Sequence, residues 1–270
     1  MIDAWLAALA GLLIGSFLNV CIYRWPRDLS VVRPRSYCPQ CEKPIAWFDN
    51  IPLISFLLLR GRCRHCRARI PIRYLIVELL TAISFFVSFW FLGASAPAVK
   101  YCVFAAVMIT LIFSDLEERI LPDEFTLGGA AAGVILAAFV PLRWGIMSLL
   151  VHSVHNMRVV SCAEAVFAGC VCAGALWLIR FVYEKVRHRE GLGFGDVKMV
   201  GMIGTFLGLE GALLALFVGS VLGSIMGLFY IWFAGKDATY EFPFGSFLGV
   251  AALAVAFILG VILHGSNATM

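Results

Sequence analysis

The stretch YCVFAAVMITLIFSDLEERILPDEF, residues 101–125, shows the pattern on which the fold of this chain rests. A run of mostly apolar residues ends at Asp115, and four more acidic residues follow within the next nine positions. A helix of about 20 apolar residues crosses the hydrocarbon core of a bilayer. The segment therefore predicts a membrane-spanning helix that carries a carboxyl group to one membrane face.

The whole chain has the composition of a membrane protein. Of its 270 residues, 61% are hydrophobic and 14% are charged, with a mean hydropathy of +0.92, whereas a soluble domain carries about 25% charged residues. Because helices satisfy their own backbone hydrogen bonds in lipid, we expect an all-α polytopic membrane protein with about eight transmembrane helices. The predicted spans are 4–23, 74–92, 98–114, 125–140, 162–183, 198–208, 211–233 and 244–264. The span 198–208 is short, so it is either a half-span or part of the next one.

The distribution of basic residues predicts the topology. The first span carries its positive charges after the apolar run, so we interpret it as a retained helix rather than a cleaved signal peptide. The polar segment 24–73 holds eleven of the 21 Lys and Arg residues, which places it in the cytoplasm. Eight spans then put 18 of the 21 on the inner side and both termini outside. The net charge of +4 lies mainly in these inner loops and indicates contact with membrane lipid, not nucleic acid.

The same polar segment contains a predicted metal site. It carries CPQC at 38–41 and CRHC at 63–66, separated by 21 residues. Two such pairs offer four thiolates, Cys38, Cys41, Cys63 and Cys66, which suffice to close a tetrahedral structural Zn²⁺ site. Neighbouring arginines favour thiolates, and the reducing cytoplasm disfavours disulfides. The alternatives are unligated or redox-active pairs, or His65 in place of one ligand. We expect the other five cysteines to be packing residues.

A second acidic position matches Asp115. In GLGFGDVKM, residues 191–199, Asp196 opens the short sixth span. The predicted topology brings both carboxyl groups to the cytoplasmic ends of their helices. A buried acid costs about 2.5–3.5 kcal/mol on insertion scales, so a function is expected. Two facing acids share one proton, and such a pair can activate water and protonate a leaving nitrogen, as aspartic proteases do. Gly193 and Gly195 would allow backbone to approach an extended substrate.

Simpler interpretations of the same acids remain open. Asp196 can stabilise a helix N-terminus, and Asp115 can be an ordinary acid at a membrane boundary. Asp123 and Glu124 have the position of helix caps before the fourth span. The string EGLGFG resembles the glycine-rich loop of soluble methyltransferases, but it enters a membrane span instead of joining a strand to a helix. We therefore exclude that analogy.

Several segments together resemble the bacterial type IV prepilin peptidases over nearly the full length of the chain. The matching segments are GSFLNVCIYR (15–24), CPQC (38–41), DNIPLISFLLLRGRCRHC (49–66), RYLIVELLTA (73–82), DLEERILPDE (115–124) and GLGFGDVKM (191–199). The resemblance implies that Asp115 and the Asp196 of the G-x-G-D motif are the catalytic pair. Many family members carry D-x-D at the first site, whereas here the second acid is Glu117, a minor candidate.

The resemblance also implies the activity. Such enzymes remove a short basic leader from type IV prepilins and from pseudopilins of type II secretion at the cytoplasmic face of the bacterial inner membrane. They then methylate the new N-terminal residue with S-adenosylmethionine. The implied parts are a first transmembrane helix at 1–23, a zinc-binding loop at 24–73 and a transmembrane aspartyl protease core at 74–270. Some members lack the paired cysteines, so zinc is not required for their chemistry.

The site of methyl transfer is not assigned by the sequence. The candidates near the inner face are Glu78, Asn19 and Asp49. However, Glu78 could be a first-turn acid that is stabilised by the helix dipole, and Asn19 could form a hydrogen bond between two helices. The outer segment 141–161, with His152 and His155, is expected to be an interfacial helix, or alternatively a metal site.

Three other functions are compatible with parts of the pattern. Paired membrane acids also occur in proton-coupled transporters, but here both acids lie at one face and no inverted repeat is present. A scaffold for pilus assembly would use the cysteine loop to bind the pilus machinery, and the two acids would have no catalytic role. A G-x-G-D protease without methylation is the third alternative.

Overall fold

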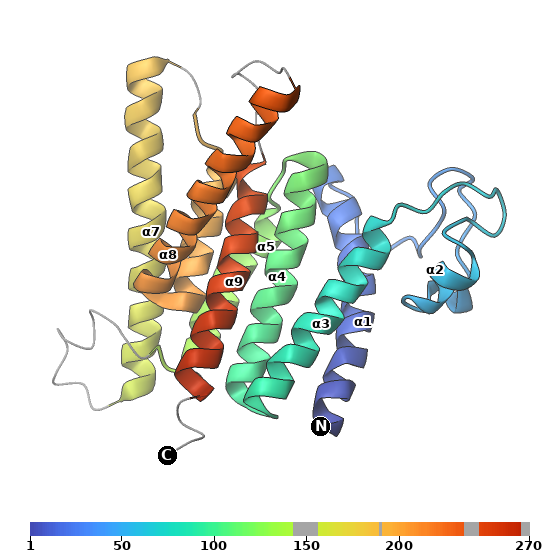
Figure 1. The fold of residues 1–270 in the computed structure, drawn as a ribbon, viewed down its shortest axis with the longest axis horizontal. Helices are drawn as coiled ribbons and strands as arrows, with labels where there is room; N and C mark the ends of the chain where they lie inside the picture. The colour runs from blue at the N-terminus through green and yellow to red at the C-terminus, as the bar shows by residue number, and fades with distance from the viewer. Residues whose placement is uncertain (143–155, 189–190, 235–242, 266–270) are drawn as a thin grey trace. The chain divides into compact units, whose positions relative to one another are not determined.

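The computed structural model describes residues 1–142, 156–188, 191–234 and 243–265. Within these residues the protein is all-helical, and the only β-structure consists of two isolated bridges. The longer helices are α1 (Ile2–Arg24), α3 (Arg73–Leu92), α4 (Ala96–Glu118), α5 (Asp123–Ala137), α7 (Met157–Arg187), α8 (Phe194–Ala234) and α9 (Phe244–Gly265) (Figure 1). Two 3₁₀ turns, Trp25–Arg27 and Trp47–Asn50, and the short helix α2 (Ile54–Leu58) lie between α1 and α3.

The helices agree with the predicted apolar segments, so the all-helical fold is confirmed. Five of the described helices are long and apolar enough to cross a membrane: Ile2–Arg27, Arg73–Leu92, Ala96–Glu118, Met157–Arg187 and Phe194–Tyr230. Helix α5 and the apolar part of α9 are shorter. The predicted spans 198–208 and 211–233 both lie in α8, which consists of two helical parts joined at the non-helical residue Gly208. The assignment of loops to the inner and outer sides stays a prediction.

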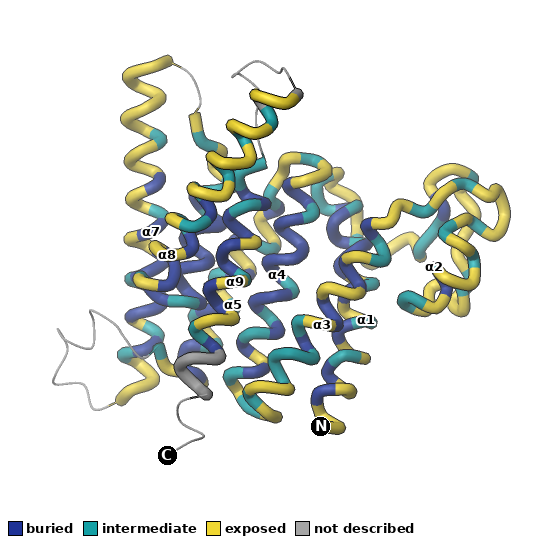
Figure 2. Tube along the Cα trace, in the orientation of Figure 1, coloured by how far each residue is buried: buried dark blue, intermediate teal, exposed yellow. Residues whose placement is uncertain are grey.

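Helix α8 bends where the sequence predicted an interruption. Gly208 has φ 74° and ψ −179°, a backbone conformation that costs a residue with a side chain far more than glycine. The bend separates a mostly buried N-terminal part of α8 from a largely exposed C-terminal part (Figure 2). The exposed part is apolar and therefore suited to face lipid.

The chain forms two compact units, 1–110 and 111–270. In the first unit, α1 packs against α3 through two glycines one helical turn apart. A Cβ atom on Gly11 would lie 2.8 Å from Cα of Ala82, and one on Gly15 would lie 2.8 Å from Cα of Glu78. Small residues at this spacing let two membrane helices approach until their backbones touch.

Asn19 continues the same interface one turn further along α1. Its Nδ2 donates to the carbonyl oxygen of Tyr74 at 3.0 Å and to that of Gly15 at 3.3 Å. The hydrogen bond between helices that the sequence allowed for Asn19 is therefore present.

In the second unit, α8 packs against α5, α7 and α9. Its contact with α7 depends on small residues on both sides. A Cβ atom on Gly204 would lie 2.9 Å from the carbonyl oxygen of Ala168, and one on Gly169 would lie 2.8 Å from Cγ2 of Thr205. The first half of α8 is thereby held close to its neighbours, and Asp196 lies in the first turn of this half.

Replacing Gly204 by leucine tests this packing. The new side chain would press on the backbone of α7, and overpacking of this kind typically costs about 1–3 kcal/mol. We expect a lower thermal unfolding midpoint in detergent. Gly227→Leu is the matched control, because a Cβ atom added to Gly227 of the same helix would meet no other atom within 4 Å. Equal midpoints for both variants would contradict the packing described.

Candidate functional site

The two predicted aspartates lie at the ends of different helices of the second unit. Asp115 is in the last turn of α4, which ends at Glu118, and its side chain is buried, with 6% of the residue exposed. The helix closes at Arg119, where φ is 54° and the amide donates to the carbonyl oxygen of Asp115 at 3.0 Å. Asp196 is in the first turn of α8 and is half-buried.

The two carboxyl groups meet at Gly245, near the start of α9. A Cβ atom on Gly245 would lie 3.2 Å from Oδ2 of Asp115 and also 3.2 Å from Oδ1 of Asp196. The two oxygens are therefore no further apart than twice that distance. The missing side chain leaves space between them, and a substituent at this position would fill it. The structure thus brings together two residues that are 81 positions apart in the sequence.

Ser246 completes this cluster, and the sequence analysis did not identify it. Its backbone amide donates to Oδ2 of Asp115 at 2.7 Å, and its Oγ lies 2.8 Å from the same oxygen. Ser246 is itself buried, with 4% exposed. The signal in the sequence is slight, since it consists of one small polar residue at the start of an apolar span.

The glycine-rich segment supports Asp196 through close contacts. A Cβ atom on Gly193 would lie 3.0 Å from Oδ2 of Asp196, and the carbonyl oxygen of Gly193 accepts the Asp196 amide at 3.2 Å. A Cβ atom on Gly195 would lie 3.0 Å from Cβ of Leu121. Neither glycine has a positive φ, so lack of space, not backbone conformation, explains why glycine fits here. The expected approach of substrate backbone stays a prediction.

The acids that follow Asp115 have different environments. The expectation that Asp123 caps α5 is wrong, because the N-cap position is occupied by Pro122. Instead, a carboxylate oxygen of Asp123 binds Nζ of Lys198 at 2.6 Å. This ion pair joins the start of α5 to the first turns of α8. Glu117, the minor candidate for the first catalytic acid, is exposed, in contrast to buried Asp115.

The four cysteines of the polar segment gather in the first unit. Their sulfur atoms all lie within 4.8 Å of one another, and the Sγ atoms of Cys38 and Cys66 are 3.8 Å apart. His65 is exposed and is not part of this group. The arrangement can hold a metal ion with four thiolate ligands and no open position. Of the remaining cysteines, Cys21, Cys102 and Cys172 are buried, as packing residues would be.

The two cysteine pairs are built alike. The amide of Cys38 donates to the carbonyl oxygen of Lys43, and that of Cys63 donates to the carbonyl oxygen of Ala68. In each turn the residue four positions after the first cysteine, Glu42 or Arg67, has a positive φ and donates its amide back to that cysteine. This turn brings the two sulfurs of each pair to one side.

Two thiols of the cluster, Cys63 and Cys66, have pKa values shifted in opposite directions. Amides of Cys66 and His65 lower the pKa of Cys63 to about 7, which favours the thiolate. Cys66 has an amide donor in Ala68, but burial and the neighbouring thiols raise its pKa to about 11. Four thiolates this close repel one another, and a divalent cation offsets that repulsion.

The sequence of this chain matches known protein families. The model of the type IV leader peptidase family matches residues 102–228, and the model of the bacterial peptidase A24 N-terminal domain matches residues 9–92. A prepilin leader peptidase/N-methyltransferase of Neisseria gonorrhoeae is 32% identical over 273 residues, covering 91% of this chain and 87% of the relative. The chain belongs to the type IV leader peptidase family. The resemblance seen in the sequence is confirmed.

Other family members show the same similarity. A protein of the same name from Aeromonas hydrophila is 33% identical over 270 residues, with 91% of this chain and 87% of the relative aligned. One from Myxococcus xanthus is 38% identical over 226 residues, and there the chain spans 84% of its own length but 62% of the relative. No solved structure matches this chain significantly. The chain is thus a multi-pass membrane protein of a bacterial peptidase family.

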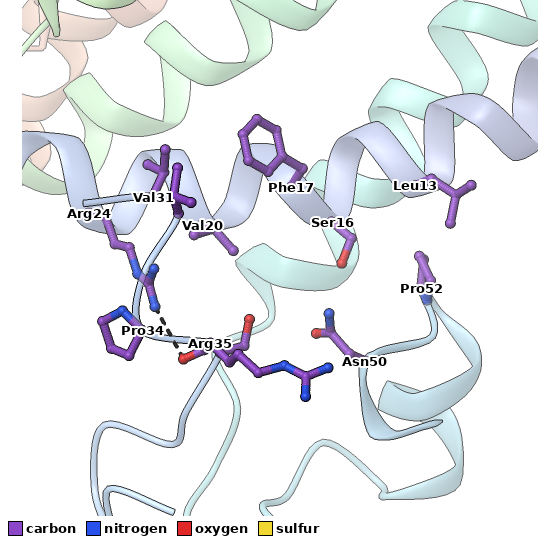
Figure 3. Close-up of a pocket in the computed structure, with 12 residues that line it drawn as sticks. Leu13, Ser16, Phe17, Val20, Arg24, Val31, Pro34, Arg35, Asn50 and Pro52 are labelled. Carbon is purple, nitrogen blue, oxygen red and sulfur yellow. Dashed lines mark hydrogen bonds between the residues drawn. The ribbon is translucent and has the colours of Figure 1, made fainter. Parts of the chain in front are cut away.

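A cavity of about 360 Å³ lies in the first unit, between α1 and the polar segment (Figure 3). One side is formed by Ser16, Phe17 and Val20 of α1. The opposite side is formed by loop residues, with Asn50 and the guanidinium of Arg35 pointing into the same space (Figure 3). The cavity therefore combines an apolar surface with a cation and several hydrogen-bonding groups.

Two of the three residues considered for methyl transfer, Asp49 and Glu78, have separate partners. Asp49 pairs with Arg64, whose guanidinium holds the pKa of that carboxyl below its usual range. Glu78 is buried and accepts the amide of Leu53 at 2.8 Å, next to the cavity wall. Glu78 is the sixth residue of α3, so it lies beyond the first turn, where an acid would be stabilised by the helix dipole. Residues 143–155, including His152 and His155, lie outside the described residues.

Proposed function

We propose that this protein is an intramembrane aspartic prepilin leader peptidase that also acts as an N-methyltransferase, with Asp115 and Asp196 as its catalytic pair. The observation that carries the proposal is the convergence of the two carboxyl groups at Gly245. The names of the relatives support the substrate class and the two activities. We propose that the site acts at the cytoplasmic face of the bacterial inner membrane, on prepilins or pseudopilins.

The chemistry follows from two acids that hold one proton between them. The ionised carboxylate takes a proton from water as the water oxygen attacks the scissile carbonyl carbon. The protonated carboxyl gives its proton to the leaving nitrogen, and the carbon–nitrogen bond breaks. Water is consumed, and the pair again holds one proton. We expect an extended substrate backbone to approach the pair near Gly245, and exposed Glu124 would supply negative charge toward a basic leader.

Asp115→Asn and Asp196→Asn should each abolish leader cleavage. Each change keeps the shape of the side chain but removes a group that transfers a proton, which typically costs about 10²–10⁴-fold in rate. The measurement is cleavage of a prepilin by the purified variant, read from the mass of the mature N-terminus. Glu117→Gln is the control, since Glu117 is exposed, and it should retain cleavage. Continued leader removal by either Asn variant, or normal pilus processing in cells, would favour a scaffold role instead.

We further propose that the four cysteines hold a structural Zn²⁺. The tetrahedral thiolate set supplies cross-links within a segment that is too polar to form a core of its own. The ion pair of Arg64 with Asp49 and the contact of Leu53 with Glu78 add to this stabilisation. The division of the chain into the helix 1–23, the loop 24–73 and the core 74–270 remains a prediction.

Metal analysis tests the zinc proposal. Purified protein should contain about one zinc per chain, and Cys63→Ser should lose it, because removing one of four ligands opens the site. Chelation should lower the thermal unfolding midpoint. Cys170→Ser provides the control, since Cys170 is an exposed cysteine of α7 outside the cluster. Equal metal content in the two variants would argue against the assigned ligands.

We propose that the methyl donor, S-adenosylmethionine, binds in the cavity of the first unit. Arg35 can pair with its carboxylate, Phe17 and Val20 offer an apolar surface for the adenine ring, and Ser16 and Asn50 offer hydrogen bonds. The buried carboxyl of Glu78, which accepts the amide of Leu53, lies next to the wall of this cavity as a further polar group. When bound, the donor supplies an electrophilic methyl group for the new N-terminal amine.

Direct binding tests this location without requiring turnover. Arg35→Ala should weaken binding of labelled S-adenosylmethionine to the purified protein by about 10–100-fold, the range expected for loss of a charged hydrogen bond. Arg33→Ala is the matched control, because Arg33 is a nearby exposed arginine that does not line the cavity. Unchanged binding by Arg35→Ala would exclude this cavity. Absence of binding to the unaltered protein would instead favour a protease without methylation.

A further inference from the structure

The environment of the two aspartates is unequal. Oδ2 of Asp115 is within hydrogen-bond distance of two groups of one residue, the amide of Ser246 at 2.7 Å and its Oγ at 2.8 Å. Both residues are buried. Hydrogen bonds to a carboxylate are stronger than those between neutral groups, and donors fixed on one oxygen stabilise negative charge on that oxygen.

The hydroxyl group of Ser246 has one hydrogen and two acceptors within reach. Its Oγ lies 2.8 Å from Asp115 and 3.1 Å from the carbonyl oxygen of Ile112. When Asp115 is ionised, the hydrogen can point to the carboxylate, and when Asp115 is protonated, it can turn to Ile112 while Oγ accepts from the acid. Rotation of the hydroxyl hydrogen alone can therefore adapt Ser246 to either protonation state of Asp115, with no movement of the backbone.

Fewer hydrogen-bond donors stabilise a negative charge on Asp196 than on Asp115. The amide of Gly193 approaches its carboxyl group, but no side-chain donor reaches it among the described residues. Among the described residues, Arg119, which follows α4, is a positive charge that acts on Asp115. Glu117 and Glu118 follow Asp115 in the last turn of α4, and Lys198, two residues after Asp196, is paired with Asp123. The first turn of α9, from Phe244 to Phe247, contains no titratable side chain.

We propose that Ser246 is a positioning residue that keeps Asp115 as the ionised member of the pair and so leaves Asp196 as the protonated member. This inference rests on the proposed peptidase function and assigns the two roles within it. Asp115 takes the proton from water while the water oxygen forms the new bond to the carbonyl carbon. Asp196 donates its proton to the leaving nitrogen as the peptide bond breaks. The proton held by Asp115 then passes to Asp196, and the resting pair is restored.

The test is the pH dependence of kcat/KM for leader cleavage by the full-length protein. Ser246→Ala removes one donor from Asp115, so the pair binds a proton more readily and the acidic limb of the profile should move to higher pH. The expected shift is about one pH unit, the size that loss of one hydrogen bond to a charged group gives. The rate should fall at low pH and recover as the pH rises.

Two further variants separate this role from a structural one. Ser246→Thr keeps a hydroxyl and should restore the unaltered profile. Ser114→Ala is the matched control, because Ser114 is a buried neighbour of Asp115 whose hydroxyl donates to the carbonyl oxygen of Ile120 instead. Its profile should keep the same acidic limb. If Ser246→Ala does not fold, Ser246→Cys, with a weaker donor, should show a smaller shift in the same direction.

Each outcome decides the inference. A shift in Ser246→Ala that is absent from Ser246→Thr and Ser114→Ala supports it. A profile that is unchanged in Ser246→Ala, or shifted equally in Ser114→Ala, overturns the role of Ser246 while leaving the catalytic pair intact. Cleavage that survives Asp115→Asn overturns the proposed peptidase site itself, so the two failures can be told apart.

Discussion

The close approach of two carboxyl groups around a glycine is the constraint on which the second unit depends. Asp115 and Asp196 stand at the ends of α4 and α8, and the start of α9 passes between them. A side chain at position 245 would occupy the space that separates the oxygens. The helices must therefore be placed so that no side chain of α9 fills the centre of the site.

The close packing of helices elsewhere in the unit has the same physical basis. Gly204 and Gly169 allow α7 and α8 to touch. A Cβ atom on Gly219 of α8 would lie 2.9 Å from Cα of Leu248 in α9. Lipid supplies no hydrophobic drive for helices to associate, so contact must come from close packing and polar bonds. The small residues that bring α8 near its neighbours also fix the position of Asp196. Stability and site geometry thus depend on the same contacts.

Much of this arrangement could be predicted from the sequence, because the relevant patterns are local. Apolar runs gave the helices, paired CxxC motifs gave the sulfur cluster, and Asp115 and Asp196 each marked the end of a helix. Ser246 was missed because its partner Asp115 is 131 positions away, and a single serine has no local signal. The ion pair of Asp123 with Lys198 was missed because the two residues are also far apart in the sequence. An acid just before a helix suggests a cap instead.

The two cysteine turns suggest how the loop acquires its ion. Each turn is closed by its own backbone hydrogen bonds, so the two sulfurs of a pair face the same way independently of the other pair. Once one turn has bound a cation, the second turn is present at a high effective concentration, because the connecting chain is short. Binding of an ion would then require two preformed turns to come together, not four separate ligands to be gathered.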